Sequence, residues 1–313
     1  MTHIGELLAE RQRSWLDHPI ITESAVLPTR SVRDAVARVT RISRKARASI
    51  AFWADPVVGK SFCIQAIRKT VEKEFPGAGI LSLEAVEDKQ QAEGRLLVSI
   101  LKSIGFVHKV DRDLAEKRDQ VKRALIALSG HAKRIFIFID EAQEVSNQEF
   151  AWLKKVINDL SGAGIKVTTI MFGQRELLRR KANLKADGRS DLSERFMKVM
   201  LEFKGLRKAR DLTVVCEAMD QHSEYPEGSG WTYTRYLFPR AYDGGFRFAK
   251  MVPVLWDRLV ALVPPIMLKQ GLPMEVIAAL MANLCIACKE QDGPDLAFDV
   301  KVVDRALVQA LGG

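Results

Sequence analysis

Three short segments of the sequence carry residue types that could handle a nucleoside triphosphate. The first, residues 54–61, reads Ala-Asp-Pro-Val-Val-Gly-Lys-Ser and follows a hydrophobic stretch. Glycine, lysine and a hydroxyl residue in this order, between a strand and a helix, are typical of a phosphate-binding loop. Gly59 lets backbone N–H groups approach phosphate because it has no Cβ. We expect Lys60 to contact the β- and γ-phosphates and Ser61 to ligate Mg²⁺.

The loop departs from the strict pattern at its first residue, where Ala54 replaces glycine. The looser form of the pattern accepts alanine, so the loop remains a candidate nucleotide site. The residues expected to line it are Ala54, Asp55, Pro56, Val57, Val58, Gly59, Lys60, Ser61 and Phe62.

The second segment, residues 135–143, reads Ile-Phe-Ile-Phe-Ile-Asp-Glu-Ala-Gln, a buried-strand pattern that ends in an acidic pair. Asp140 would hold Mg²⁺ through water, and Glu141 would act as general base toward the attacking water. The alternative is that the pair caps the next helix, since acids favour helix N-termini.

The third segment is Met171-Phe172-Gly173-Gln174-Arg175, where another hydrophobic strand ends in a polar residue. Gln174 could donate to the γ-phosphate or to the lytic water. The alternative is a polar turn residue without a chemical role.

The elements that position these segments alternate between strand and helix. Strands are predicted at 48–54, 79–85, 134–139, 165–172 and 197–203. Helices are predicted at 31–47, 61–74, 91–104, 113–129 and 147–160. This alternation predicts an α/β fold with a parallel sheet covered on both faces, which binds ligands at the carboxyl ends of its strands.

After Gly205 only helices are predicted, at 209–222, 248–262, 273–290 and 299–311. The sequence therefore favours three parts: an N-terminal arm (1–29), a nucleotide-binding core (30–205) and a helical lid domain (206–313). An aromatic-rich stretch at 223–246 interrupts the lid. It is either an ordered loop that packs its own aromatic rings or a surface that docks a partner.

The basic charge is concentrated in two segments. The chain of 313 residues has a formal net charge of +9. Residues 30–48 hold seven basic residues and one acid, and residues 175–210 hold twelve basic residues and five acids. Localised charge of this kind favours binding to the phosphate backbone of duplex DNA without sequence preference. The alternative for either cluster is a solvated helix face.

Composition points to a cytoplasmic protein without a membrane partner. Four cysteines are too few for a disulfide scaffold, and the first residues contain acids and no apolar core of a signal peptide. The apolar runs are too short for a transmembrane helix.

The phosphate loop, the Asp-Glu-Ala-Gln motif and the Phe-Gly-Gln-Arg-Glu strand end together resemble the AAA+ ATPases. Within these, the likeness is to the TnsC/TniB group and its relatives MuB and the ExeA-like ATPases, over roughly residues 30–205. The resemblance implies a P-loop NTPase fold, a three-layer αβα parallel sheet of strand order 5-1-4-3-2 with a C-terminal helical lid. It also implies ATP, Mg²⁺ and assembly into rings or filaments, and it places the Gln174 strand between the other two motif strands.

The resemblance implies roles for further residues. An arginine near the end of the last helix before the fifth strand acts on the neighbouring subunit's nucleotide, and Arg195 occupies that place, with Arg189 as second choice. Arg247 fits a lid arginine that contacts phosphate in its own subunit. DNA contacts are expected after the second strand and in the second basic cluster, at Lys89, Arg95, Arg179, Arg180 and Lys181.

The function that the resemblance implies is regulation of DNA transposition. Such a protein assembles on duplex DNA with ATP, recruits transposase and target-selector proteins, and disassembles on hydrolysis. Two alternatives stay open: a nucleotide-gated scaffold of a secretion or defence system that does not bind DNA, and an ATPase of the helicase-loader type.

Overall fold

The computed structural model describes residues 14–45, 47–56, 58–85 and 92–312. These residues form two compact units. The first comprises the described parts of 1–33, 57–62 and 204–313, and the second comprises those of 34–56 and 63–203. Each unit is described by itself below.

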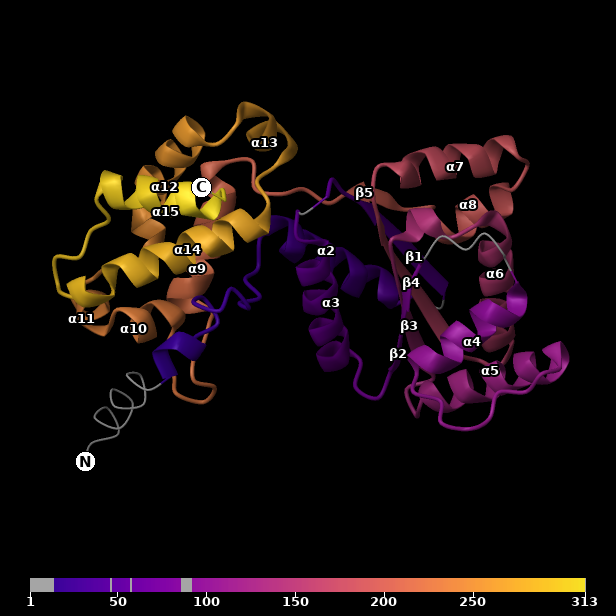
Figure 1. Cartoon of the computed structure of the whole chain (residues 1–313). Coiled ribbons are helices and arrows are strands. Elements are labelled where there is room, and N and C mark those ends of the chain that lie inside the picture. Colours follow the sequence, from indigo (N-terminus) through magenta and orange to yellow (C-terminus); the bar gives the residue numbers. More distant parts are fainter. Residues whose placement is uncertain (1–13, 46, 57, 86–91, 313) are drawn as a thin grey trace. The chain divides into compact units, whose positions relative to one another are not determined.

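The second unit is built on a five-stranded sheet (Figure 1). Its strands are β1 (Arg47–Trp53), β2 (Gly79–Glu84), β3 (Arg134–Asp140), β4 (Lys166–Gly173) and β5 (Met200–Glu202). All neighbouring strands are parallel, and their order is β2-β3-β4-β1-β5. This is the predicted order, read from the other edge. The predicted α/β class and the position of β4 between β1 and β3 are therefore confirmed.

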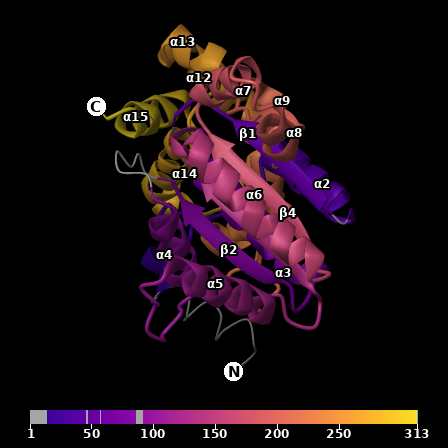
Figure 2. The same ribbon diagram turned by 90° about the vertical axis from the view of Figure 1, so that its right-hand side faces the viewer.

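Helices cover both faces of this sheet. Their bounds are α2 (Arg30–Ser43), α3 (Lys60–Glu74), α4 (Glu93–Ser103), α5 (Leu114–Leu128), α6 (Asn147–Gly162), α7 (Glu176–Ala186) and α8 (Ser190–Phe196), with a 3-10 turn η2 (Ala142–Glu144). α2 and α3 lie on one face and α4, α5 and α6 on the other (Figures 1 and 2).

The central strand β3 explains why two helical layers form. All residues from Ile135 to Ile139 are at most 2% exposed. Ile135, Ile137 and Ile139 pack with the helices of one face, in a cluster that includes Ile100 of α4 and Phe150 of α6. Successive side chains of a strand point to opposite faces, so a strand without polar positions must be covered on both sides.

Two predicted boundaries are wrong. The helix predicted at 31–47 ends at Ser43, and Arg47 already pairs with Val167 as the first residue of β1. The apolar stripe of this helix ends at Ile42, so nothing beyond it favours a further buried turn. The strand predicted at 197–203 is reduced to β5, because only three residues pair with β1.

The first unit is helical. Its elements are η1 (Trp15–Asp17), α9 (Ala209–Gln221), α10 (Tyr233–Leu237), α11 (Pro239–Asp243), α12 (Phe248–Leu262), α13 (Pro265–Gln270), α14 (Met274–Cys288), η3 (Lys289–Gln291) and α15 (Val300–Ala310). A helical C-terminal region is thus confirmed. None of the helices in the described residues is both long and apolar enough to cross a bilayer.

The aromatic-rich stretch at 223–246 belongs to the core of this helical unit. The rings of Tyr225, Tyr233 and Tyr236 surround His18, with centroids 4.8, 4.8 and 5.1 Å away. Phe246 packs edge-on against Phe248 and Phe298. These contacts support the interpretation as an ordered segment that packs its aromatic rings. The packing of His18 between the three tyrosines was not predicted from the sequence, since it joins residue 18 to a segment more than 200 residues away.

Candidate nucleotide site

The three strands of the second unit that carry the motif segments end at one edge of the sheet. Trp53 at the end of β1 pairs with Gly173 at the end of β4. Ile139, one residue before the end of β3, pairs with Met171. The residues that follow each strand therefore lie side by side at the carboxyl edge, where ligands bind in open α/β sheets.

Glu141 is the centre of a hydrogen-bond network at this edge. Its Oε2 accepts from Gln143 Nε2 at 2.6 Å and from Gln174 Nε2 at 3.3 Å. The side chain of Gln143 also accepts at Oε1 from the backbone N of Gln174, at 2.9 Å. The predicted general base Glu141 is thus brought together with Gln174, the residue predicted to donate to the γ-phosphate or to the lytic water, and Gln143 connects both.

The contacts of Gln143 with Glu141 and Gln174 were not predicted from the sequence. The signal was present as the last letter of the Asp-Glu-Ala-Gln motif, but only the fold shows that its amide reaches the end of β4. Gly173 leaves room for this contact, since a Cβ there would lie 2.7 Å from Gln143 Oε1.

The acidic pair does not act as a helix cap by its side chains. Glu141 precedes η2 with a left-handed backbone (φ 48°) and makes no side-chain capping bond. α6 is capped instead by Ser146 and Glu149 in a capping box. Asp140 Oδ1 accepts from the backbone N of Glu141 at 2.9 Å, which fixes the turn between the two acids.

The start of the phosphate loop is fixed by contacts within the same unit. The backbone N of Ala54 donates to Gly173 O at 3.0 Å. Arg175 holds Asp55 with two hydrogen bonds, Nε to Oδ1 at 2.6 Å and Nη2 to Oδ2 at 3.1 Å. Ala54 is not among the residues with positive φ, so the backbone there does not need glycine.

The remainder of the loop belongs to the first unit, except that Val57 lies outside the described residues. Val58 is buried, and Gly59 has φ +94°, a conformation that favours glycine. Lys60 is the first residue of α3 and half-buried, while Ser61 is exposed in the first turn. Backbone N–H groups at such a helix start favour an anion.

Ser61 and Asp140, each taken in its own unit, are residue types that bind Mg²⁺, an ion held in nucleotide sites mainly by phosphate and water. Mg²⁺ usually takes one or two protein ligands and keeps several waters. Ser61 offers a hydroxyl and Asp140 a carboxylate. The described residues contain no group of three or more His, Cys, Asp or Glu side chains that could hold a metal by themselves.

Arg195 lies toward the opposite edge of the sheet. It is the penultimate residue of α8, and the next residue, Phe196, accepts from Ser49 Oγ near the start of β1 at 2.7 Å. Its guanidinium is half-buried and makes no hydrogen bond or ion pair with any described residue. Burial, with a smaller effect of Arg47, lowers the pKa of Arg195. Arg189 instead pairs with Asp191, with Nε 3.3 Å from Oδ1.

Arg247 of the first unit is held by its own loop. Its Nη1 donates to Tyr242 O at 2.8 Å and to Phe246 O at 2.5 Å, and its guanidinium lies 3.5 Å from the centre of the Tyr242 ring. It directly precedes α12. A phosphate contact of Arg247 remains a prediction.

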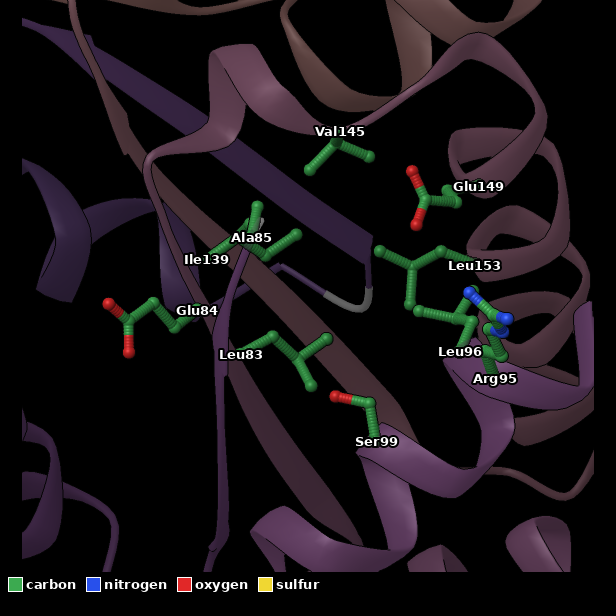
Figure 3. Close-up of a pocket in the computed structure, with 10 residues that line it drawn as sticks. All are labelled: Leu83, Glu84, Ala85, Arg95, Leu96, Ser99, Ile139, Val145, Glu149 and Leu153. Atoms are coloured by element: carbon green, nitrogen blue, oxygen red, sulfur yellow. The ribbon is translucent and has the colours of Figure 1, made fainter. Parts of the chain in front are cut away.

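The residues predicted to contact DNA differ in their surroundings. Lys89 lies outside the described residues. Arg95 is exposed on α4 at a cavity of about 210 Å³ between the ends of β2 and β3 and the helices α4 and α6 (Figure 3). Arg179 is exposed, Lys181 is half-buried, and Arg180 donates Nε to Gln143 O at 3.0 Å. Burial lowers the pKa of Arg180.

This architecture is similar to one known family model and to several solved structures. Residues 43–180 match the family model described as an AAA domain. The ORC2 protein of Aeropyrum pernix, in ADPNP–ADP complexes, matches with a TM-score of 0.55 and 13% identity, over 93% of this chain and 71% of that chain. Its ADP form matches with a TM-score of 0.54 and 15% identity, over 93% and 72%.

A third solved structure is that of the ORC1 protein of Aeropyrum pernix in complex with DNA. It matches with a TM-score of 0.52 and 12% identity, over 93% of this chain and 69% of that chain. The search of curated protein sequences finds no match. At these identities the likeness concerns the fold. The sheet order, the surrounding helices and the AAA-domain match define an AAA+ P-loop NTPase fold.

Proposed function

We propose that this protein is an ATP-hydrolysing AAA+ ATPase that assembles with further copies of itself on duplex DNA. The observation that carries the proposal is the network around Glu141. A carboxylate fixed by two amide side chains at the carboxyl edge of a P-loop sheet is suited to orient and deprotonate a water molecule.

Each residue then has one task. Lys60 and the loop backbone bind the phosphates. Ser61 and Asp140 would hold Mg²⁺, which would supply positive charge against the phosphates. Glu141 takes a proton from the water whose oxygen forms a bond to the γ-phosphorus, while the bond between that phosphorus and the β–γ bridging oxygen breaks. The products are ADP and inorganic phosphate. Gln174 donates to the γ-phosphate or to the water.

Arg195 acts on a second copy of the chain. It lies toward the edge where the strands begin, whereas the phosphate loop follows the end of β1. A strand of seven residues spans about 20 Å, which is beyond the reach of one arginine side chain. A half-buried guanidinium with no hydrogen-bond or ion-pair partner among the described residues is suited to meet the γ-phosphate of a neighbouring subunit.

DNA is the proposed partner of the assembly. The net charge of +9 and its concentration in two clusters support binding to a polyanion. The solved complex of Aeropyrum pernix ORC1 with DNA shows a protein of this fold on that ligand. The finer proposal is regulation of DNA transposition through recruitment of transposase and target-selector proteins, with hydrolysis driving disassembly. It rests on the Asp-Glu-Ala-Gln and Phe-Gly-Gln-Arg-Glu motifs.

A second candidate function is that of a replication initiator or helicase loader. The observation that favours it is the likeness to the ORC proteins, which extends through the helical unit and covers 93% of this chain. The partner that the DNA-bound protein recruits, a transposase or a replicative helicase, distinguishes the two.

The test is electron microscopy of the purified protein with duplex DNA, either with a non-hydrolysable ATP analogue or without nucleotide. We expect rings or filaments on DNA only with the analogue. Nucleotide-dependent rings that ignore DNA would favour the scaffold alternative, and no assembly under any condition would contradict the proposal.

A further inference from the structure

The two basic clusters of the sequence differ in how their charges are used. In the second cluster, Arg175 is bound to Asp55, Arg180 to Gln143 O and Arg189 to Asp191. Further along, Arg207 donates Nε and Nη2 to Gln270 O. Four of the twelve basic residues in that cluster therefore bind other groups of the protein itself.

The first cluster shows the opposite pattern. Residues 38–47 contain five basic residues and no acid. These residues, Arg38, Arg41, Arg44, Lys45 and Arg47, are all exposed. None of their side chains forms a hydrogen bond or ion pair with a described residue.

The end of α2 brings this cluster to the edge of the sheet where the strands begin. Ser43 O accepts a hydrogen bond from Arg134 Nη1 at the start of β3. The backbone N of Lys166, at the start of β4, donates to Lys133 O at 2.9 Å. Lys133 and Lys166 are also exposed. The seven exposed cations, five from residues 38–47 and these two lysines, form one surface, which we term the amino-edge basic patch.

We infer that the amino-edge basic patch is the surface that binds the phosphate backbone of duplex DNA, ahead of the contacts predicted on α7. This inference rests on the proposed DNA binding and names the surface for it. Residues three or four positions apart on a helix are about 5–6 Å apart, so Arg38 and Arg41 are neighbours on α2, and Arg44 and Lys45 follow directly after its last residue. Guanidinium groups bind phosphate with paired N–H donors.

Other polyanions fit the patch less well. A helix that binds a membrane surface inserts large apolar side chains next to its basic face. In α2 the apolar residues Val32, Ala35 and Val39 are buried, and no large apolar residue described between 30 and 47 is exposed. The patch also contains no aromatic ring on which single-stranded bases could stack.

The test compares two variants that each lose three positive charges. The patch variant carries Arg38→Gln, Arg41→Gln and Arg44→Gln, and the matched control carries Lys102→Gln, Lys109→Gln and Lys122→Gln, three exposed lysines in or between α4 and α5. Affinity for a fluorescent DNA duplex is measured by anisotropy over a salt series, with a non-hydrolysable ATP analogue. Thermal melting and binding of a fluorescent ATP analogue verify that each variant is folded.

We expect the patch variant to bind DNA at least about tenfold more weakly, with a salt slope smaller by about 3, because each lost phosphate contact removes about one released counterion. The control should keep the slope. Wild-type affinity in a folded patch variant, or the loss in the control alone, would overturn the inference and leave the proposed function intact.

Two further results would distinguish a failure of the proposed function from a failure of the inference. If the wild-type protein hydrolyses ATP but binds no duplex in any nucleotide state, the DNA part of the proposed function fails before any variant is compared. If it binds phosphatidylserine vesicles through the same three arginines but not DNA, the patch serves a membrane and the inference is wrong.

Discussion

Gln143 Nε2 donates a hydrogen bond of 2.6 Å to Glu141 Oε2, while Gln143 Oε1 accepts from the backbone N of Gln174 at 2.9 Å. One amide side chain therefore joins the proposed general base after β3 to the backbone of Gln174 after β4. Rotation of the Glu141 side chain would break its hydrogen bond with Gln143, and the side chain of Gln174 is held by its own bond from Nε2 to Glu141 Oε2 at 3.3 Å.

We predict that Gln143→Leu lowers kcat for ATP hydrolysis about tenfold, because Glu141 loses the shorter of its two amide contacts. Affinity for a fluorescent ATP analogue should stay unchanged, since Gln143 is not in the phosphate loop. The exposed Gln148 of α6 provides the matched control. Equal rates for Gln143→Leu and Gln148→Leu would show that the network does not position the base.

Within the phosphate loop, an exchange between glycine and alanine should weaken nucleotide binding at position 59 and have no effect at position 54. Gly59→Ala places a side chain at φ +94° and 3.1 Å from Met274 Cγ. A left-handed backbone costs a non-glycine residue about 1–2 kcal/mol, so nucleotide affinity should fall about tenfold. Ala54→Gly should leave the affinity unchanged. Calorimetric titration with ATP measures both, and weakening by Ala54→Gly alone would contradict the assignment of the loop.

His18 should make the helical unit sensitive to acid. Burial lowers its pKa from 6.5 to about 3. The unfolded chain therefore binds a proton below pH 6.5 that the folded chain does not bind until about pH 3. Stability is fully present above pH 6.5 and falls between these values, by up to about 5 kcal/mol.

Urea unfolding of wild type and His18→Phe between pH 7 and pH 4 tests this dependence. The variant cannot take up the proton, so its stability should decline less steeply. His131→Gln, at an exposed histidine, is the control and should follow the wild type. An unchanged slope in His18→Phe would mean that carboxylates alone cause the acid sensitivity.

Asp220 should be essential for the stability of the helical unit. Its buried carboxylate accepts from Thr234 Oγ1 at 2.6 Å and from the backbone N of Phe248 and Ala249 at 3.0 and 2.9 Å, which caps α12. Asp220→Ala leaves three donors unsatisfied and should cost about 3 kcal/mol. Thermal melting measures the loss, and Asp243→Ala, at an exposed aspartate, should change little.

Local pattern was sufficient to predict the sheet and the motif residues at its edge. Five runs of apolar, β-branched residues and the helical repeats between them define parallel strands, and the acids after β3 follow from the strand end. The contacts of Gln143 with Gln174, of Arg175 with Asp55 and of His18 with its tyrosines join residues distant in sequence. No periodicity encodes such contacts, because they depend on how elements pack. The end of α2 was misplaced because arginine and lysine suit an exposed helix as well as a turn.

The central claim is that ATP hydrolysis needs Arg195 from a second copy, and subunit mixing tests it most directly. Arg195→Ala and Glu141→Gln should each abolish hydrolysis while ATP binding persists. In an equimolar mixture, interfaces that join an intact Glu141 to an intact Arg195 form at random, so about a quarter of the wild-type rate should return. A mixture as inactive as its components would contradict a site shared between subunits.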